Sequence, residues 1–239
     1  MAINAKLVPP ASPANGPGGR PSGWLLALDT ATDQAGIALF DGVRIAEVSW
    51  PAGRRQTVRL LPAIEGLLAA CDISLDAVGA IGVAIGPGTF TGLRVGLSVA
   101  KGLAALSERA IIGVSTIAIA AEPYGSSGDP VLVTLPAGRG RVVWAVKEAG
   151  EEAGEPVNSS LEELAAVLAD HPEFLLAGEL LPDQREHLLA VHHHAAPITA
   201  SARRPSSLAR LAWERWLRGE LDDPELIEPI YLHGQSGGR

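Results

Sequence analysis

The chain has 239 residues, which is enough for one sizeable core or two smaller ones, and no apolar run reaches the roughly 18 residues that a membrane helix needs. Its formal net charge of −8 at pH 7 gives an acidic surface that would repel a phosphate backbone, so unaided binding to nucleic acid is not expected. Cys71 is the single cysteine, which excludes an intrachain disulfide and a cysteine-built zinc or iron–sulfur site. These properties predict a soluble, cytoplasmic protein that does not associate with a membrane.

Composition also suggests how the chain is divided. Residues 1–22 are rich in Ala, Pro, Gly and Asn and lack the apolar stretch of a secretory signal, so we expect a disordered extension there. A Gly, Ser and Pro cluster follows Tyr124 and marks a boundary. We therefore predict an N-terminal lobe at 23–122, a C-terminal lobe at 123–233 and a tail at 234–239.

The first half begins with three short apolar runs, which predict strands at 24–29, 35–40 and 43–50. Asp41-Gly42 lies between the second and third runs and suits a two-residue hairpin turn. Apolar residues at helical spacing then predict a helix at 55–70, with Pro62 expected to kink it or delay its start. The chain thus opens with an antiparallel meander and a helix.

Residues 80–85 carry no polar side chain, which is typical of a strand covered on both faces. A helix is predicted at 91–106, with Thr89 or Thr91 as its N-cap, and a further strand at 110–114. In the second half the same reasoning predicts strands at 131–135, 141–147 and 174–177, and helices at 161–169, 181–191 and 205–218.

A meander followed by alternating helices and strands, with a shorter and related second half, predicts an α/β fold. We expect the actin-like or Hsp70-like (ASKHA) duplicated fold. In that fold each of two lobes has a mixed β-sheet flanked by helices, and the second lobe would here be reduced.

Several segments resemble one protein family closely. They are LALDTAT at 26–32, IGPGTFTGLRVG at 85–96, GVST at 113–116, the strand at 140–145, PSS at 205–207 and PIYL at 229–232. Together they resemble the TsaB (YeaZ) family, and the resemblance covers residues 24–233.

The resemblance implies a non-catalytic scaffold or activator subunit. The complex to which it would belong transfers threonylcarbamoyl to N6 of adenosine 37 in tRNAs that read ANN codons. The implied partners are TsaD, a paralogue that would form a heterodimer with this chain, and the ATPase TsaE, with tRNA reached only through the complex. A homodimer is the alternative assembly. No cofactor is expected, with ATP or ADP at the subunit junction as the alternative.

The resemblance also implies that TsaD binds a metal through a His-x-x-x-His pair on one helix face. The histidines of this chain are His171, His187, His192, His193, His194 and His233, and no two of them are four residues apart. Two imidazoles on one face of a helix need that spacing. We therefore expect no metal site and no catalytic residue.

Asp29 and Thr30 stand where a first strand enters a turn, the place where actin-like ATPases position a cation and phosphates. A vestigial nucleotide site at these two residues is one alternative, and an ASKHA-type nucleotide-binding kinase or metallohydrolase is the alternative function. The candidate for a second phosphate loop, Gly178-Glu179, has one glycine and an acid that would repel phosphate. We favour the simpler interpretation, in which Asp29 is a turn acid hydrogen-bonded to its own backbone.

The predicted partner interface consists of two helix surfaces. Small residues recur every four positions in the second helix, so another helix could approach closely, and the first helix has more apolar residues than one core-facing stripe requires. The small ridge could pack on the chain's own sheet or on a partner, and the family resemblance favours the partner. The interface residues are Leu60, Leu61, Ile64, Leu67, Leu68, Gly92, Gly96, Ala100 and Ala104.

Overall fold

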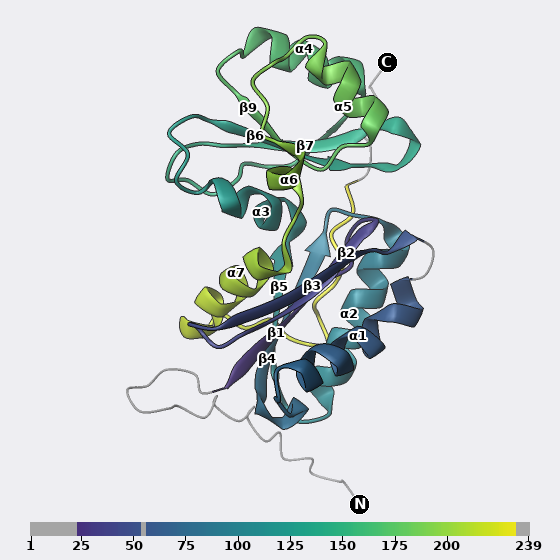
Figure 1. The fold of residues 1–239 in the computed structure, drawn as a ribbon, viewed down its shortest axis with the longest axis vertical. Helices are drawn as coiled ribbons and strands as arrows, with labels where there is room; N and C mark the ends of the chain where they lie inside the picture. The colour runs from purple at the N-terminus through teal and green to yellow at the C-terminus, as the bar shows by residue number, and fades with distance from the viewer. Residues whose placement is uncertain (1–22, 54–55, 233–239) are drawn as a thin grey trace, which may run out of the picture.

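The computed structural model describes residues 23–53 and 56–232, which form two lobes along the long axis of the molecule (Figure 1). The predicted extension at 1–22, the tail at 234–239 and His233 lie outside the described residues.

The first lobe contains a five-stranded sheet with the order β3-β2-β1-β4-β5. Its strands are β1 (Trp24–Asp29), β2 (Gln34–Phe40), β3 (Ile45–Pro51), β4 (Val78–Gly86) and β5 (Ala110–Ser115). The first three strands form an antiparallel meander, while β4 runs parallel to both β1 and β5. The sheet is therefore mixed, as the sequence pattern predicts.

The second lobe repeats this order in a four-stranded sheet, β8-β7-β6-β9, without a counterpart of the fifth strand. Its strands are β6 (Val131–Pro136), β7 (Val142–Lys147), β8 (Val157–Ser159) and β9 (Leu175–Gly178). Here too a meander is followed by a strand parallel to its first member, since β9 pairs with β6. The predicted duplicated α/β fold with a reduced second lobe is confirmed.

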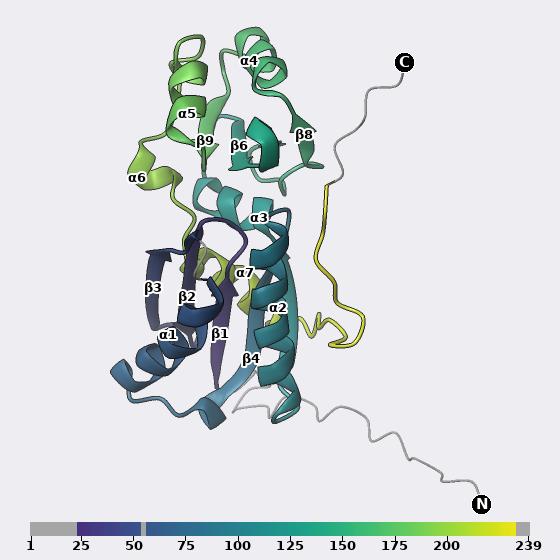
Figure 2. The same cartoon turned by 90° about the vertical axis from the view of Figure 1, so that its right-hand side faces the viewer.

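Helices cover both faces of each sheet. Over the first sheet, α1 (Gln56–Ala70) and α2 (Phe90–Ala105) lie on one face and α7 (Pro205–Leu217) on the other (Figures 1 and 2). Over the second sheet, α3 (Thr116–Ala121) lies on one face and α4 (Leu161–Asp170) and α5 (Pro182–Leu189) on the other. A short helix, α6 (Ile198–Ser201), precedes the return to the first lobe.

The continuous apolar character of β1 follows from this layering. Leu26 and Leu28 face the core beneath α1 and α2, whereas Leu25 and Ala27 face the core beneath α7. All four side chains are fully buried. Because successive side chains point to opposite faces of a strand, a sheet covered on both sides needs an uninterrupted apolar run.

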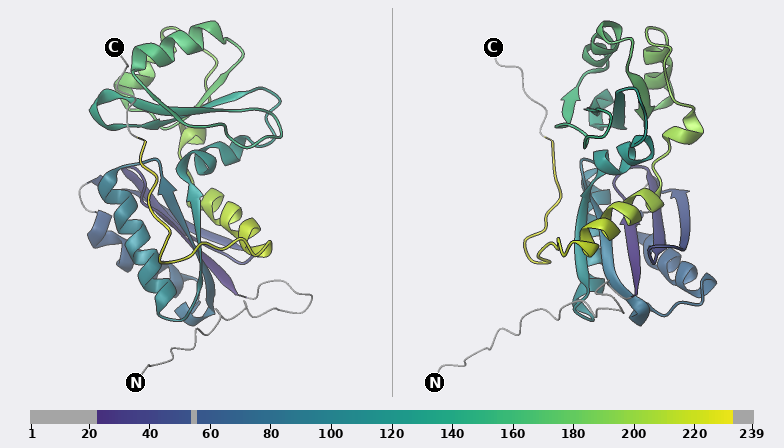
Figure 3. Two further views of the ribbon diagram at one scale, coloured as in Figure 1. Left: turned by 180° about the vertical axis from the view of Figure 1, so that it is seen from behind. Right: turned by 90° about the vertical axis from the view of Figure 1, so that its left-hand side faces the viewer.

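The chain crosses back to the first lobe near its end. Helix α7 belongs by sequence to the second half, yet it packs on β1, β2, β4 and β5 (Figure 3). Trp216 and Leu208 of α7 are buried against the first sheet. One face of the first lobe is therefore covered by the last helix of the chain.

Three local predictions need correction. The β2–β3 connection spans residues 41–44, because the Asp41 carboxylate accepts hydrogen bonds from the N–H groups of Val43 and Arg44 and widens the turn. Of the two effects predicted for Pro62, a delayed start of the helix is excluded, because α1 begins at Gln56 and Pro62 lies inside it. The polar and acidic sequence at 150–158 predicts a surface loop, yet the last two of these residues begin the short strand β8.

Candidate functional site

The small-residue ridge of α2 faces the chain's own core. Gly92, Gly96, Ala100 and Ala104 are all buried, and a Cβ atom on Gly96 would overlap Oγ1 of Thr30. The Thr30 hydroxyl donates a hydrogen bond to the carbonyl oxygen of Gly92 at 2.7 Å. The predicted contact of these four residues with a partner is therefore wrong, and the alternative contact with the chain's own sheet is correct.

Helix α1 divides its apolar residues between two faces. Leu60, Ile64 and Leu68 are buried in the core, so their predicted place in an interface is also wrong, and Leu67 packs partly against the same core. Leu61 is 55% exposed and Val58, which the interface prediction omitted, is 75% exposed. The apolar surface available to a partner thus lies on the outer face of α1.

An exposed aromatic group lies at the start of α2, where Phe90 is 57% exposed. The Phe90 ring stacks on Tyr231 with centroids 5.5 Å apart, and the Arg94 guanidinium lies 3.9 Å from the centre of the Phe90 ring. Nε of Arg94 also donates a hydrogen bond to the Tyr231 hydroxyl at 3.0 Å. Through Tyr231, these contacts hold the C-terminal segment, residues 222–232, against the N-terminal end of α2. At the same end of α2, the Thr89 hydroxyl accepts a hydrogen bond from the Gly92 N–H and so provides the predicted N-cap.

A cleft of about 950 Å³ lies between the lobes. Thr32 and Gln34 line it from the first lobe, Leu135 and Leu180 from the second, and Tyr231 from the C-terminal segment. Its walls are formed by the loops at the ends of β1, β6 and β9. This is the position in which a doubly covered α/β sheet presents its strand ends to a ligand.

A buried cluster of charges lies beside this cleft, and we call Arg203, Asp29, Glu179 and Thr32 the Arg203 node. Nε of Arg203 donates to Oδ2 of Asp29 at 2.5 Å, and Nη2 donates to Oδ1 at 3.0 Å. Nη1 of Arg203 donates to Oε1 of Glu179 at 2.6 Å. The Thr32 hydroxyl donates to Oε2 of Glu179 at 2.7 Å. The node thus joins an acid at the end of β1 to an acid just past β9.

Burial lowers the pKa of the Arg203 guanidinium, but the two carboxylates outweigh that effect and the pKa is raised, so the side chain stays charged. Removing one partner of such a buried ion pair typically costs about 3–5 kcal/mol, because the other charge is left without compensation. Removal of any one charge from the node is therefore expected to destabilise the folded chain.

Asp29 and Thr30, the candidates for a vestigial nucleotide site, are both engaged within the chain. Oδ1 of Asp29 accepts from the Ala31 N–H at 3.1 Å, as the turn interpretation predicts, and both carboxylate oxygens also accept from Arg203. The Thr30 hydroxyl is used by Gly92. A charged guanidinium that contacts both oxygens of this carboxylate would repel a second cation, so the residues present do not fit a nucleotide-bound divalent ion at Asp29.

The histidines within the described residues do not form a metal-binding cluster. His192 is buried, and its Nε2 lies 2.7 Å from the carbonyl oxygen of Phe174 and 3.1 Å from that of His194. Within residues 23–53 and 56–232, no three His, Cys, Asp or Glu side chains are grouped closely enough to hold a metal ion.

The sequence pattern did not identify Arg203 as a site residue, and it indicated Glu179 only as an acid that would repel phosphate. Arg203 and Asp29 are 174 positions apart, so no local spacing connects them. Asp29 and Glu179 each stand at the end of a strand, and this could have indicated the site. If the two strand ends meet in the interior, their carboxylates need a buried cation between them.

Comparisons with known proteins identify the family to which the chain belongs. The family model described as TsaD, tRNA N6-adenosine threonylcarbamoyltransferase, matches residues 50–200, more than half of the chain. The tRNA threonylcarbamoyladenosine biosynthesis protein TsaB of Escherichia coli is 36% identical over 123 residues, which are 51% of this chain and 53% of the relative. TsaB of Bacillus subtilis is 38% identical over 94 residues, 39% of this chain and 41% of the relative. The chain spans about half the length of the curated relatives that it matches.

The matches to solved structures cover a larger share of this chain than the matches to curated sequences. YeaZ from Pseudomonas aeruginosa matches with a TM-score of 0.74 and 29% identity, covering 88% of this chain and 100% of that one. A Pseudomonas aeruginosa protein described as similar to peptidase YeaZ matches with a TM-score of 0.73 and 30% identity over the same shares. None of the helices in the described part of the chain has both the length and the apolar character of a membrane span. The chain belongs to the TsaB (YeaZ) family.

Proposed function

We propose that this chain is a non-catalytic subunit of the machinery that makes threonylcarbamoyladenosine in tRNA. In this proposal it binds a TsaD-type transferase as a heterodimer and, together with TsaE, supports transfer of threonylcarbamoyl to adenosine. The tRNA would be bound by the assembly and not by this acidic chain alone, whose net charge is −8. The site of action would be the cytoplasm.

The observation that carries the proposal is the apolar outer face of α1. Val58 and Leu61 lie three positions apart and so share one side of the helix, and both are more than half exposed. Each fully buried Val or Leu side chain contributes about 1.5–3 kcal/mol, which makes such a pair a suitable centre for an interface. Arg59 beside them is also exposed and suits the rim of a contact with an acidic partner.

The non-catalytic role is supported by the state of Asp29. In the fold that this chain adopts, an acid at the end of the first strand is the group that would position a cation for nucleotide chemistry. Here Arg203 binds both of its oxygens. The chain's contribution to the reaction is then its effect on the partner's conformation or stability.

The binding part of the proposal is tested with the full chain and the TsaD-type transferase of the same organism. Leu61→Asp is expected to weaken association at least tenfold in calorimetry, because it places a charge in the apolar centre. Leu217→Asp is the matched control, since Leu217 is 44% exposed on α7 at the opposite face of the sheet. Equal binding by Leu61→Asp and the unmodified chain, or an equal loss with Leu217→Asp, would reject the α1 surface.

The functional part is tested by reconstitution. The chain, the transferase and TsaE together are expected to modify tRNA, and omission of the chain is expected to reduce the yield of threonylcarbamoyladenosine. The proposal is wrong if the chain alone performs the transfer.

A further inference from the structure

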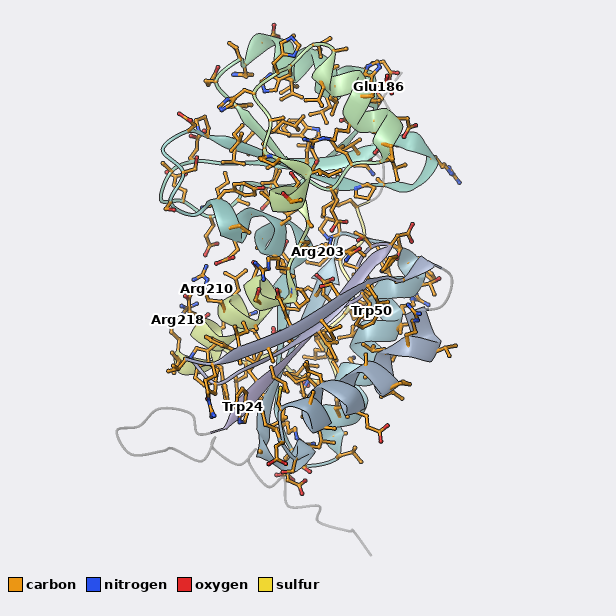
Figure 4. All side chains as sticks on the ribbon, in the orientation of Figure 1. Trp24, Trp50, Glu186, Arg203, Arg210 and Arg218 are labelled. Carbon is orange, nitrogen blue, oxygen red and sulfur yellow. The ribbon has the colours of Figure 1, made fainter. Side chains whose placement is uncertain are left out.

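Arg203 occupies the junction of the two lobes (Figure 4). Its side chain is 1% exposed, and it lies between α6 and α7, where the chain returns to the first lobe. Asp29 belongs to the first sheet, whereas Glu179 directly follows β9 of the second sheet. A single guanidinium therefore connects carboxylates that belong to different lobes.

The donors of Arg203 are distributed across that junction. Besides the bonds to Asp29 and Glu179, Nη2 donates to the Thr32 hydroxyl at 3.2 Å and to the carbonyl oxygen of Gln34 at 3.1 Å. The Thr32 hydroxyl in turn donates to Glu179, so the first lobe binds that acid both directly and through the guanidinium. Any movement that separates the lobes at this point would break charged hydrogen bonds in a buried setting, where they are strongest.

The backbone of the node is also held closely. Gly178, just before Glu179, has a φ of +91°, and a Cβ atom there would overlap backbone atoms of Thr134. The N–H of Glu179 donates to the carbonyl oxygen of Thr134 at 2.9 Å. The acid is thus presented by a fixed turn of the second sheet, and its distance to Arg203 reports the relative position of the lobes.

We propose that the Arg203 node is an internal lock that fixes the opening of the interlobe cleft, with the guanidinium in the place that a divalent cation would take between Asp29 and Glu179. The lock makes the lobe arrangement independent of an added cation. It goes beyond the proposed partner binding, since it concerns the chain by itself and uses no residue of the outer face of α1.

The test measures the distance between the lobes in the full chain. Spin labels are attached to Ser107→Cys, just past α2, and Ala169→Cys, on α4, after Cys71→Ser removes the native thiol; both labelled positions are exposed. Arg203→Met keeps much of the side-chain volume and removes the charge. We expect the interlobe distances to lengthen and their distribution to broaden relative to the parent chain.

The matched control is Arg204→Met. Arg204 is the next residue, its side chain is 65% exposed, and its ion pair with Glu47 lies within the first lobe. This variant is expected to keep the parent distances. Glu179→Gln is a second variant that tests the lock, because it weakens the link to the second lobe while the Asp29–Arg203 pair remains. It replaces Arg203→Met in the distance measurement if Arg203→Met does not fold. A parental distribution in a folded Arg203→Met or Glu179→Gln chain would overturn the proposal.

A cation titration gives an independent readout. Without the guanidinium, two carboxylates and a hydroxyl would face one another, and MgCl2 is expected to raise the Tm of Arg203→Met by about 2–4 °C while leaving the parent and Arg204→Met unchanged. An equal rise in the parent, or none in Arg203→Met, would show that the guanidinium does not stand in for a cation.

Discussion

The inner and outer faces of the α1–α2 layer contain similar residue types and have different surroundings. On the inner face, Leu60 and Gly96 are sealed against the first sheet, whereas on the outer face Leu61 and Gly102 meet solvent. The comparison teaches that apolar content and small-residue spacing identify which residues share a face. They do not identify what covers that face.

The largest expected difference is between two neighbouring leucines. Leu60→Ala leaves a cavity beneath α1 and should lower the free energy of unfolding by about 3 kcal/mol, as buried leucine truncations typically do. Leu61→Ala removes a side chain that is 55% exposed and should change it by less than about 0.5 kcal/mol. Urea denaturation of the two variants measures both values, and similar losses would contradict the assignment of faces.

A smaller effect of the same kind is expected at two glycines of α2. Gly96→Val would force a side chain against Thr30 and Val83 and should cost about 2 kcal/mol through overpacking. Gly102→Ala meets no atom within 4 Å and should stabilise the helix by about 0.5–1 kcal/mol. Thermal unfolding measures both, and a Gly96→Val chain as stable as the parent would mean that the ridge is not packed as described.

The smallest effect concerns the outer end of α2. Arg94→Ala removes the cation over Phe90 and the hydrogen bond to Tyr231, together worth about 1 kcal/mol at an exposed site. We expect faster hydrogen exchange at the Ile230 amide, which donates to the carbonyl oxygen of Ile85 at 2.7 Å. Arg59→Ala on α1 is the control and should leave that exchange rate unchanged, whereas equal acceleration by both variants would argue against a local role of Arg94.

Much of the fold could be predicted because it is encoded locally. The strand at 24–29 and the helix beginning at Leu161 are found where apolar periodicity predicts them, and the structure adds a complete capping box between Ser160 and Glu163. The antiparallel meander of the first three strands is also found as predicted. Burial of the α2 ridge could not be predicted in the same way, because spacing leaves the direction of a face open.

The Arg203 node could not be predicted for a different reason. Its ion pairs depend on where two distant strand ends and the segment before α7 meet in space. Asp29 is a turn acid when read locally, and it accepts the predicted backbone hydrogen bond. Its second role appears only when the two lobes are placed together.

The return of α7 to the first sheet has a consequence for biosynthesis. As the chain leaves the ribosome, the five strands of the first sheet are complete by Ser115, yet the face formed by Leu25, Ala27 and Ala80 stays uncovered until Leu217 has been made. The N-terminal lobe therefore cannot finish folding before the second lobe has been synthesised. A fragment that ends between the lobes would expose this apolar sheet face and would be prone to aggregate. The two halves therefore have to be produced and studied as one polypeptide.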